Sequence, residues 1–198
     1  MLTRNYYHIM ERLLTGYSGG YPSAADRTVD NWLADKYMLV KEYGGSIATV
    51  DPDISAYGVF GYDADNKANV SSSTAIGWNW LLVGSSDAEE TYDDYTIEFV
   101  TTLTAQGNRA STYEYTHTGT VMHTNKVFVN NTTEDVVIKE IGMFTGTGVY
   151  VGSSNSRNAR PVLVYRKKLD EPITIPANGG VANIALDINI PAQNKPSA

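Results

Sequence analysis

The chain has 198 residues, a net charge of −7 and no cysteine. This length suits one main domain with a sizeable core, and the missing cysteines exclude a disulfide framework, a thiol nucleophile and zinc sites built from thiolates. A pI near 4.9 argues against DNA or RNA as a main ligand, because nucleic-acid affinity comes largely from clustered Lys and Arg. No apolar run approaches the roughly 20 residues of a membrane span, and the N-terminus is too polar for a signal-peptide core. We therefore expect synthesis in the cytoplasm and no membrane partner.

The first residues predict a short amphipathic helix that begins near Thr3 and ends near Gly16. Its apolar residues recur at helical spacing: they are Leu2, Tyr6, Ile9, Met10 and Leu13. A turn-rich connector with Gly19, Gly20 and Pro22 follows. Because a helix this short is marginal in water unless its apolar stripe is packed, we expect residues 1–43 to form a helical arm and connector that docks on a neighbouring subunit or another protein of an assembly.

A second helix is predicted over residues 29–43, with Trp32, Leu33, Tyr37 and Val40 on one face, although residues 37–40 equally suit a strand. Beyond Gly44 the helical period fades.

Short apolar runs at residues 46–50, 57–62 and 75–83 are typical of sandwich strands. Period-two alternation follows over residues 95–103 and, as the longest such signal, over residues 111–129. In the second stretch we expect the odd residues to share one face: these are Tyr113, Tyr115, His117, Val121 and His123.

The C-terminal third carries three further strand signals, at residues 133–144, 161–166 and 169–175, and an alternating strand over residues 182–190. The glycine-rich stretches 142–148 and 152–156 suit hairpin loops. Pro172 and Pro176 bracket residues 173–175, as befits an edge strand that must not recruit further strands. The sequence thus predicts a mainly β chain. Residues 44–198 form an antiparallel β-sandwich, jelly-roll-like or immunoglobulin-like, whose last strand ends near Pro191, and a short helical N-terminal arm precedes it.

No constellation of residues supports catalysis, a cofactor or a metal. His117 and His123 would lie roughly 20 Å apart in one strand, with Glu114 on the opposite face, so they do not make a metal site. The acidic run 87–94 contains the neighbouring pairs Glu89–Glu90 and Asp93–Asp94, but adjacent residues of an extended segment point to opposite sides. We read this run as a solvated turn.

Carboxylates in two other loops are conceivable calcium ligands. They are Asp51, Asp53, Asp63 and Asp65. The glycine and the closing glutamate of an EF-hand are missing, so solvated turns are favoured. No nucleophile-elbow motif occurs either, and we expect no enzyme.

Trp78 and Trp80 share one face of a short strand and, with the many tyrosines, offer a sugar-stacking platform as an alternative to a core or subunit contact.

Several segments together resemble virion structural proteins of tailed bacteriophages. They cover roughly residues 75–190 and include WNWLLVG (78–84), YDDY (92–95), VFVNN (127–131), IKEIGMF (138–144), VLVYR (162–166) and ITIPANGG (173–180).

The resemblance implies a non-enzymatic β-sandwich that assembles as a symmetric oligomer on a virus particle. Capsid decoration or a head accessory role is favoured over a collar or tail component, and a receptor- or glycan-binding module of a tail fibre is the alternative. The implied partners are further copies of the chain, other virion proteins and, in the alternative, a host-surface glycan.

Overall fold

The computed structural model describes residues 1–15, 22–35, 39–50, 80–116, 118–150 and 157–191. Helix α1 (Arg4–Thr15), the 3-10 turn η1 (Ala24–Asp26) and helix α2 (Val29–Leu33) come first. The strands are β1 (Leu39–Lys41), β2 (Ile47–Val50), β3 (Trp80–Gly84), β4 (Thr104–Thr116), β5 (Gly119–Asn130), β6 (Val136–Tyr150), β7 (Arg157–Ile175) and β8 (Gly180–Pro191). None of the helices in these ranges has the length and apolar character of a membrane span.

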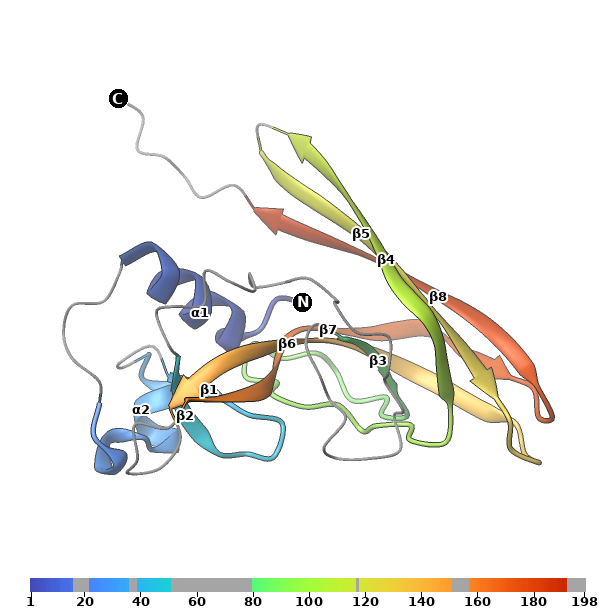
Figure 1. Cartoon of the computed structure of the whole chain (residues 1–198), viewed down its shortest axis with the longest axis horizontal. Helices are drawn as coiled ribbons and strands as arrows, with labels where there is room; N and C mark the ends of the chain where they lie inside the picture. The colour runs from blue at the N-terminus through green and yellow to red at the C-terminus, as the bar shows by residue number, and fades with distance from the viewer. Residues whose placement is uncertain (16–21, 36–38, 51–79, 117, 151–156, 192–198) are drawn as a thin grey trace.

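The strands form two antiparallel sheets (Figure 1). In the first, β6 is central: β7 pairs along one side of it, and β2 and β3 pair with opposite ends of its other side, β1 lying outside β2. The second sheet has the order β4-β5-β8. The prediction of a mainly β, antiparallel sandwich with a short N-terminal helix is confirmed. The strand orders do not identify the jelly-roll or the immunoglobulin-like arrangement.

Both sheets contribute to one hydrophobic core. Alternation along each strand divides its side chains between two faces, so Leu81 and Val83 enter the core that holds Met122 and Ile184 of the second sheet, while Leu82 points to the other face of the first sheet. There it packs with Ile97, Phe144 and Leu163 in a smaller cluster. The first sheet is therefore covered on both faces.

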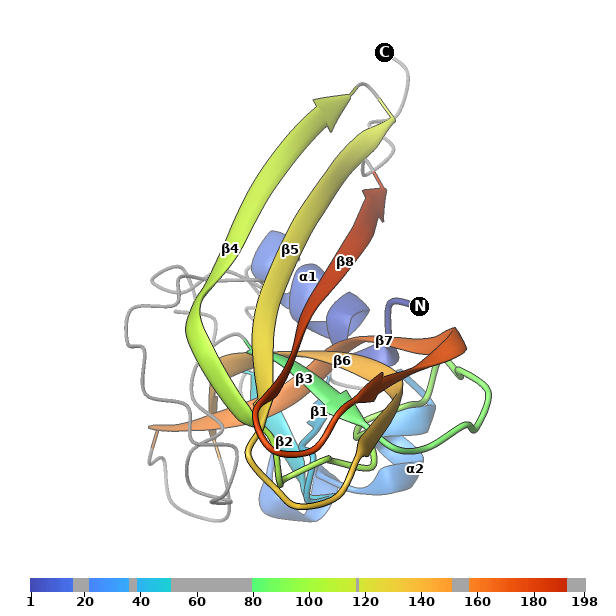
Figure 2. The ribbon, with the colours of Figure 1, turned by 90° about the vertical axis from the view of Figure 1, so that its right-hand side faces the viewer.

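The second sheet extends beyond the first. Figure 2 shows the ends of β4 and β5, with part of β8, projecting past the body of the molecule as a narrow ribbon. The base of this sheet is fixed by Asn130, which is fully buried. Its side-chain amide donates to the backbone carbonyls of Glu134 at 2.8 Å and Ile175 at 3.0 Å. Its backbone carbonyl accepts a hydrogen bond from Gly179 N at 2.7 Å. The Asn130 side chain thus ties the end of β5 to the end of β7.

The N-terminal helix packs on its own chain, which corrects the prediction of an arm that docks on a neighbour. Leu2, Tyr6 and Ile9 are buried in the main core, and Met10 packs against it. Thr3 joins the segment to β7, because its hydroxyl donates to Leu163 O at 2.8 Å and its amide to Val164 O at 3.1 Å. The side chain of Leu13 lies outside the described part.

The boundary expected between residues 43 and 44 falls within a β-hairpin. Strand β1 pairs with β2, with Leu39 opposite Thr49. The predicted helix over residues 29–43 is wrong: α2 is short, and residues 39–41 take the strand alternative. Trp32 is buried, but Leu33 is 44% exposed, and Tyr37 lies outside the described residues.

Residues 46–50, 133–144 and 182–190 are largely strand, as predicted, while residues 57–62 and most of 75–83 lie outside the described residues. Residues 95–103 form an extended segment with a single bridge, between Phe99 and Gly84. The two strands expected at residues 161–166 and 169–175 are one strand, β7, and residues 142–148 are strand, not a loop. Residues 173–175 pair only with β6 within the described ranges, which agrees with an edge strand.

The alternating stretch 111–129 is a hairpin, and this reverses its faces. Tyr113 lies opposite Met122, and Thr112 lies opposite His123. Odd residues of β4 therefore share a face with even residues of β5, so the prediction that Val121 and His123 lie on the face of Tyr113 is wrong. The reversal of the chain between Thr116 and Gly119, which lie opposite each other, changes the phase of the alternation because opposite residues share a face.

Candidate functional site

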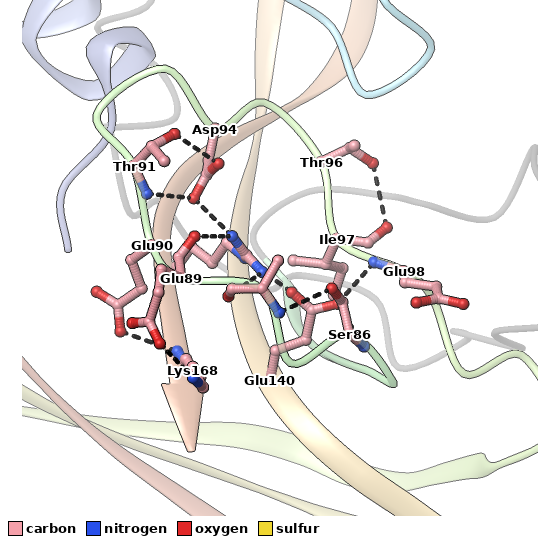
Figure 3. A network of polar contacts seen from close by, with 12 residues as sticks. Ser86, Glu89, Glu90, Thr91, Asp94, Thr96, Ile97, Glu98, Glu140 and Lys168 are labelled. Atoms are coloured by element: carbon pink, nitrogen blue, oxygen red, sulfur yellow. Dashed lines mark hydrogen bonds and ion pairs between the residues drawn. The ribbon is translucent and has the colours of Figure 1, made fainter. Parts of the chain in front are cut away.

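The most extensive polar site is a buried ion pair between β6 and β7 (Figure 3). Glu140 is fully buried and Arg166 is 5% exposed. The guanidinium Nε donates to Glu140 Oε2 at 2.7 Å, and Nη1 donates to Asp94 Oδ2 at 2.8 Å. Arg166 also donates to the carbonyls of Ala88 at 3.0 Å and Glu89 at 3.1 Å. A segment of the chain, residues 85–98, which we call the acidic loop, thus encloses the arginine.

The backbone explains why the two charges meet. A register shift between Met143 and Phe144 brings Arg166 directly opposite Gly142. A Cβ on Gly142 would lie 3.0 Å from side-chain atoms of Ile97 and Phe144, which is closer than side chains usually approach, so a residue without a side chain suits this position. The bulge therefore turns Arg166 toward the face that carries Glu140.

Glu140 also organises the acidic loop through its second oxygen. Oε1 accepts from Glu98 N at 2.7 Å and from Ser86 N at 3.2 Å. Burial lowers the pKa of Arg166, but its hydrogen bonds to Asp94 and Glu140 outweigh this effect and raise it. Each guanidinium nitrogen of Arg166 and each carboxylate oxygen of Glu140 has a hydrogen-bond partner, as a buried ion pair requires if it is to persist in a protein interior.

Three further acidic side chains of the loop bind cations of the same chain. Glu90 accepts from the N-terminal amine at 2.9 Å and from Lys168 N at 2.8 Å, and Glu89 pairs with Lys168. Asp87 lies 3.3 Å from Lys139 Nζ. The run is largely exposed to solvent and turns at residues 92–93, as predicted. The structure adds ion pairs that connect it to β6, β7 and the N-terminus.

Arg4 forms a second polar cluster at the start of α1. Its Nε donates to Asp93 at 2.8 Å, it also pairs with Asp35, and its guanidinium lies over the rings of Tyr92 at 4.6 Å and Trp32 at 5.5 Å. Burial raises the pKa of Asp35, but hydrogen bonds from His8 and Arg4 outweigh this and lower it. Arg4 thereby joins α1, α2 and the acidic loop.

These clusters have no free acid, base or nucleophile aimed at a substrate. Asp93 and Asp94 are adjacent but bind Arg4 and Arg166 respectively, which fits the expectation that they do not form a glycosidase pair. Within the described ranges, no three His, Asp or Glu side chains are grouped so as to hold a metal ion. The conceivable calcium ligands Asp51, Asp53, Asp63 and Asp65 lie outside the described residues.

The projecting sheet carries a smaller polar group on its outer face. His123 Nδ1 donates to Asp187 Oδ1 at 2.8 Å, and its Nε2 lies 3.7 Å from Glu114 Oε2. The hydrogen bond to Asp187 raises the pKa of His123. The prediction that Glu114 lies on the opposite face from His123 is wrong because the hairpin reverses direction between them, whereas His117 lies outside the described residues.

The inner face of the projecting sheet is aromatic near its tip. Tyr113 is 44% exposed and Tyr115 is 78% exposed, and their rings stack at a centroid distance of 6.3 Å. Between this tip and the N-terminal segment lies an open cleft of about 550 Å³, lined in part by Met1, Tyr7 and Ile190. The proposed platform of Trp78 and Trp80 is not described at side-chain level.

Sequence reasoning missed the pairing of Glu140 with Arg166. A signal was present, because each is a charged residue within an apolar run, IKEIGMF and VLVYR, in successive strands. Opposite charges in neighbouring buried strands are expected to pair, since an unpaired buried charge is costly. Alternation alone could not show that a bulge brings them to the same face.

Comparisons of the chain with protein-family models, with curated proteins and with solved structures gave no match.

Proposed function

We propose that this protein is a non-enzymatic structural component of a tailed-phage virion that assembles as a symmetric oligomer. The observation that carries the proposal is the ribbon formed by β4, β5 and β8, which projects past the body of the sandwich (Figure 2). A sheet that extends beyond its own core presents faces and edges to other chains. Capsid decoration or a head accessory role is favoured over a collar or tail component.

The use of the polar residues supports a structural role. The buried Glu140–Arg166 pair and the Arg4 cluster are satisfied inside the chain and fasten the loop, the helices and the first sheet together. A rigid body of this kind positions its projecting ribbon without needing a ligand. The exposed Tyr113 and Tyr115 fit an interface as well, since tyrosine is enriched at protein contacts.

The proposed partners are further copies of the chain and other virion proteins. The protein is made in the host cytoplasm and becomes part of the particle. Its acidic composition disfavours the packaged nucleic acid as a ligand.

Immunogold electron microscopy tests the proposal. Antibodies raised against the purified protein are expected to label purified phage particles at symmetric positions, and the labelled region distinguishes head from collar or tail. Pre-incubation of the antibody with free protein is the control and should abolish labelling. Particles that contain no copy of the chain by mass spectrometry would contradict the virion role.

A glycan-binding module of a tail fibre is the second candidate, favoured by the stacked, exposed rings of Tyr113 and Tyr115. Stacked amphipathic rings suit the apolar faces of sugars. A glycan array with the wild-type chain and with Tyr115→Ala separates the two functions. Binding that the variant loses would favour the fibre module, whereas no response to any glycan supports the structural role.

A further inference from the structure

Strand β8 forms one margin of the projecting sheet. It pairs with β5 from Gly180 to Pro191 without a register shift, and no other described residue pairs with it. Figure 2 shows β8 along one side of this sheet and β4 along the other. The margin formed by β4 is interrupted by a register shift between Gln106 and Ala110. The β8 margin has no such shift.

The edge strands of the two sheets differ in how they are protected from pairing with another chain. Edge strands are usually protected from pairing by proline, lysine, bulges or a covering segment. Strand β7 carries Pro161, Lys167, Lys168 and Pro172, and its middle is covered by the N-terminal residues, since Thr3 N donates to Val164 O and Arg166 N donates to Met1 O. None of these devices occurs in residues 180–190, whose single charged residue is Asp187.

We propose that β8 pairs antiparallel with β8 of a second copy of this chain, across a twofold axis at Ala185. This inference rests on the oligomeric assembly proposed above and names its contact surface. Two three-stranded sheets would then join into one six-stranded sheet. Antiparallel pairing of a strand with itself is the isologous contact expected of a twofold dimer.

The side chains of β8 are self-complementary in this arrangement. Its even residues Ile184, Leu186 and Ile188 are buried toward the core, and its odd residues from Asn183 to Asn189 are exposed. A twofold axis at Ala185 sets Ile184 opposite the second copy's Leu186, so apolar and polar faces both continue across the contact. Residues opposite each other share a face of the sheet, so this continuity follows directly from the register.

Among axes at the exposed odd residues of β8, charge and length favour this register. With the axis at Ala185, Asp187 lies opposite Asn183 of the second copy, whose amide can donate to the carboxylate, and all of residues 180–190 are paired. An axis at Asp187 would oppose two like charges, which destabilises a cross-strand pair. An axis at Asn183 would shorten the overlap to residues 180–186. Asp187 is also neutralised by His123 from β5.

Single-cysteine variants test the contact, because the chain has no cysteine of its own. In the full-length protein, Ala185→Cys places two thiols opposite each other, within the Cα separation of about 4.4–6.8 Å that a disulfide requires. We expect mild oxidation to give a covalent dimer on non-reducing gels. The matched control is Asn125→Cys, the register neighbour of Ala185 on β5, whose copies would lie about 14 Å apart across three strand spacings and should not cross-link.

A second pair of variants tests the same contact without oxidation. Ala185→Lys places two like charges at the axis and is expected to shift the dimer to monomer in light scattering, whereas Asn125→Lys should leave the dimer intact. Circular dichroism verifies that both variants fold.

The outcomes separate this inference from the proposed function. An oligomer that survives Ala185→Lys, or equal cross-linking of both cysteine variants, overturns the strand pairing but leaves the oligomeric virion protein standing. A wild-type chain that is monomeric at high concentration overturns the pairing and the oligomer together. A chain that is monomeric alone yet labels particles overturns the pairing and the oligomer but leaves the presence on the virion standing.

Discussion

Several charged residues stabilise the fold of this protein, and the burial of each ion pair determines how much it contributes to stability. Glu140 and Arg166 are buried and satisfied by each other and by the acidic loop. His123 and Asp187 form a comparable pair on an exposed face, where solvent screens the interaction. The same ion-pair chemistry should therefore have a large effect on stability at the first site and a small one at the second.

Arg166→Met is expected to destabilise the protein by about 3–5 kcal/mol, because it leaves the Glu140 carboxylate buried without its cation. Urea unfolding measures the change. The double variant Glu140→Met with Arg166→Met should lose less than the sum of the two single variants, since no buried charge remains unpaired between these positions. Strictly additive losses would contradict a direct coupling of the two residues.

The pKa of His123 is expected to lie above its ordinary value of 6.5, because the Asp187 carboxylate stabilises the imidazolium. Its contribution to stability is therefore fully present below the unfolded pKa and is lost as the pH rises through the higher folded pKa. An NMR titration of the imidazole measures this pKa. Asp187→Asn should lower it, and an unchanged pKa in that variant would contradict the hydrogen bond as its cause.

At the scale of elements, the surroundings of α1 decide its role. The helical stripe of Leu2, Tyr6 and Ile9 is present in the sequence, and the structure buries it against its own sheets. Asn5 adds specific contacts, accepting from Lys41 N at 2.8 Å and from Trp32 Nε1 at 3.2 Å. The helix is thus part of the domain rather than a free arm.

Ile9→Ala is expected to cost about 2–5 kcal/mol, the usual range for truncating a buried aliphatic side chain. Val181→Ala, at an exposed position of β8, is the control and should stay within about 0.5 kcal/mol of the wild type. Chemical denaturation measures both.

Deletion of residues 1–15 should abolish cooperative unfolding, because it removes core side chains and uncovers the middle of β7. A truncated chain that keeps its β-rich circular dichroism and its cooperative transition would support the arm predicted from the sequence.

At the scale of the whole molecule, two sheets and α1 share one core, and the chain reaches this arrangement without disulfides. Packing and the internal ion pairs carry its stability. We expect that no metal is needed for folding, since Glu90, Asp94 and Glu140 bind cations and amides of the same chain.

Thermal unfolding is therefore expected to be insensitive to EDTA. Scanning calorimetry with and without the chelator, followed by added calcium, measures the effect on Tm. A large fall in Tm that calcium reverses would assign a ligand role to Asp51, Asp53, Asp63 or Asp65, and alanine variants of these residues would then identify the site.

The sequence by itself determined the class of the fold, the N-terminal helix and the faces of β8, since Ile184, Leu186 and Ile188 alternate strictly with polar or small residues. Such local patterns report which side of a segment is apolar, because a strand repeats every two residues and a helix every 3.6.

Only the tertiary structure decided what covers each apolar face and which charges meet. The pairing of Thr116 with Gly119 placed His123 on the face opposite to the one predicted, and the register shift at Met143 turned Arg166 toward Glu140. A single inserted or unpaired residue moves every later side chain to the other face of a sheet. The pattern of apolar and polar residues does not reveal where such a residue lies. The place of α1 was also undetermined, because an amphipathic stripe has the same pattern whether its own sheet or a neighbour covers it.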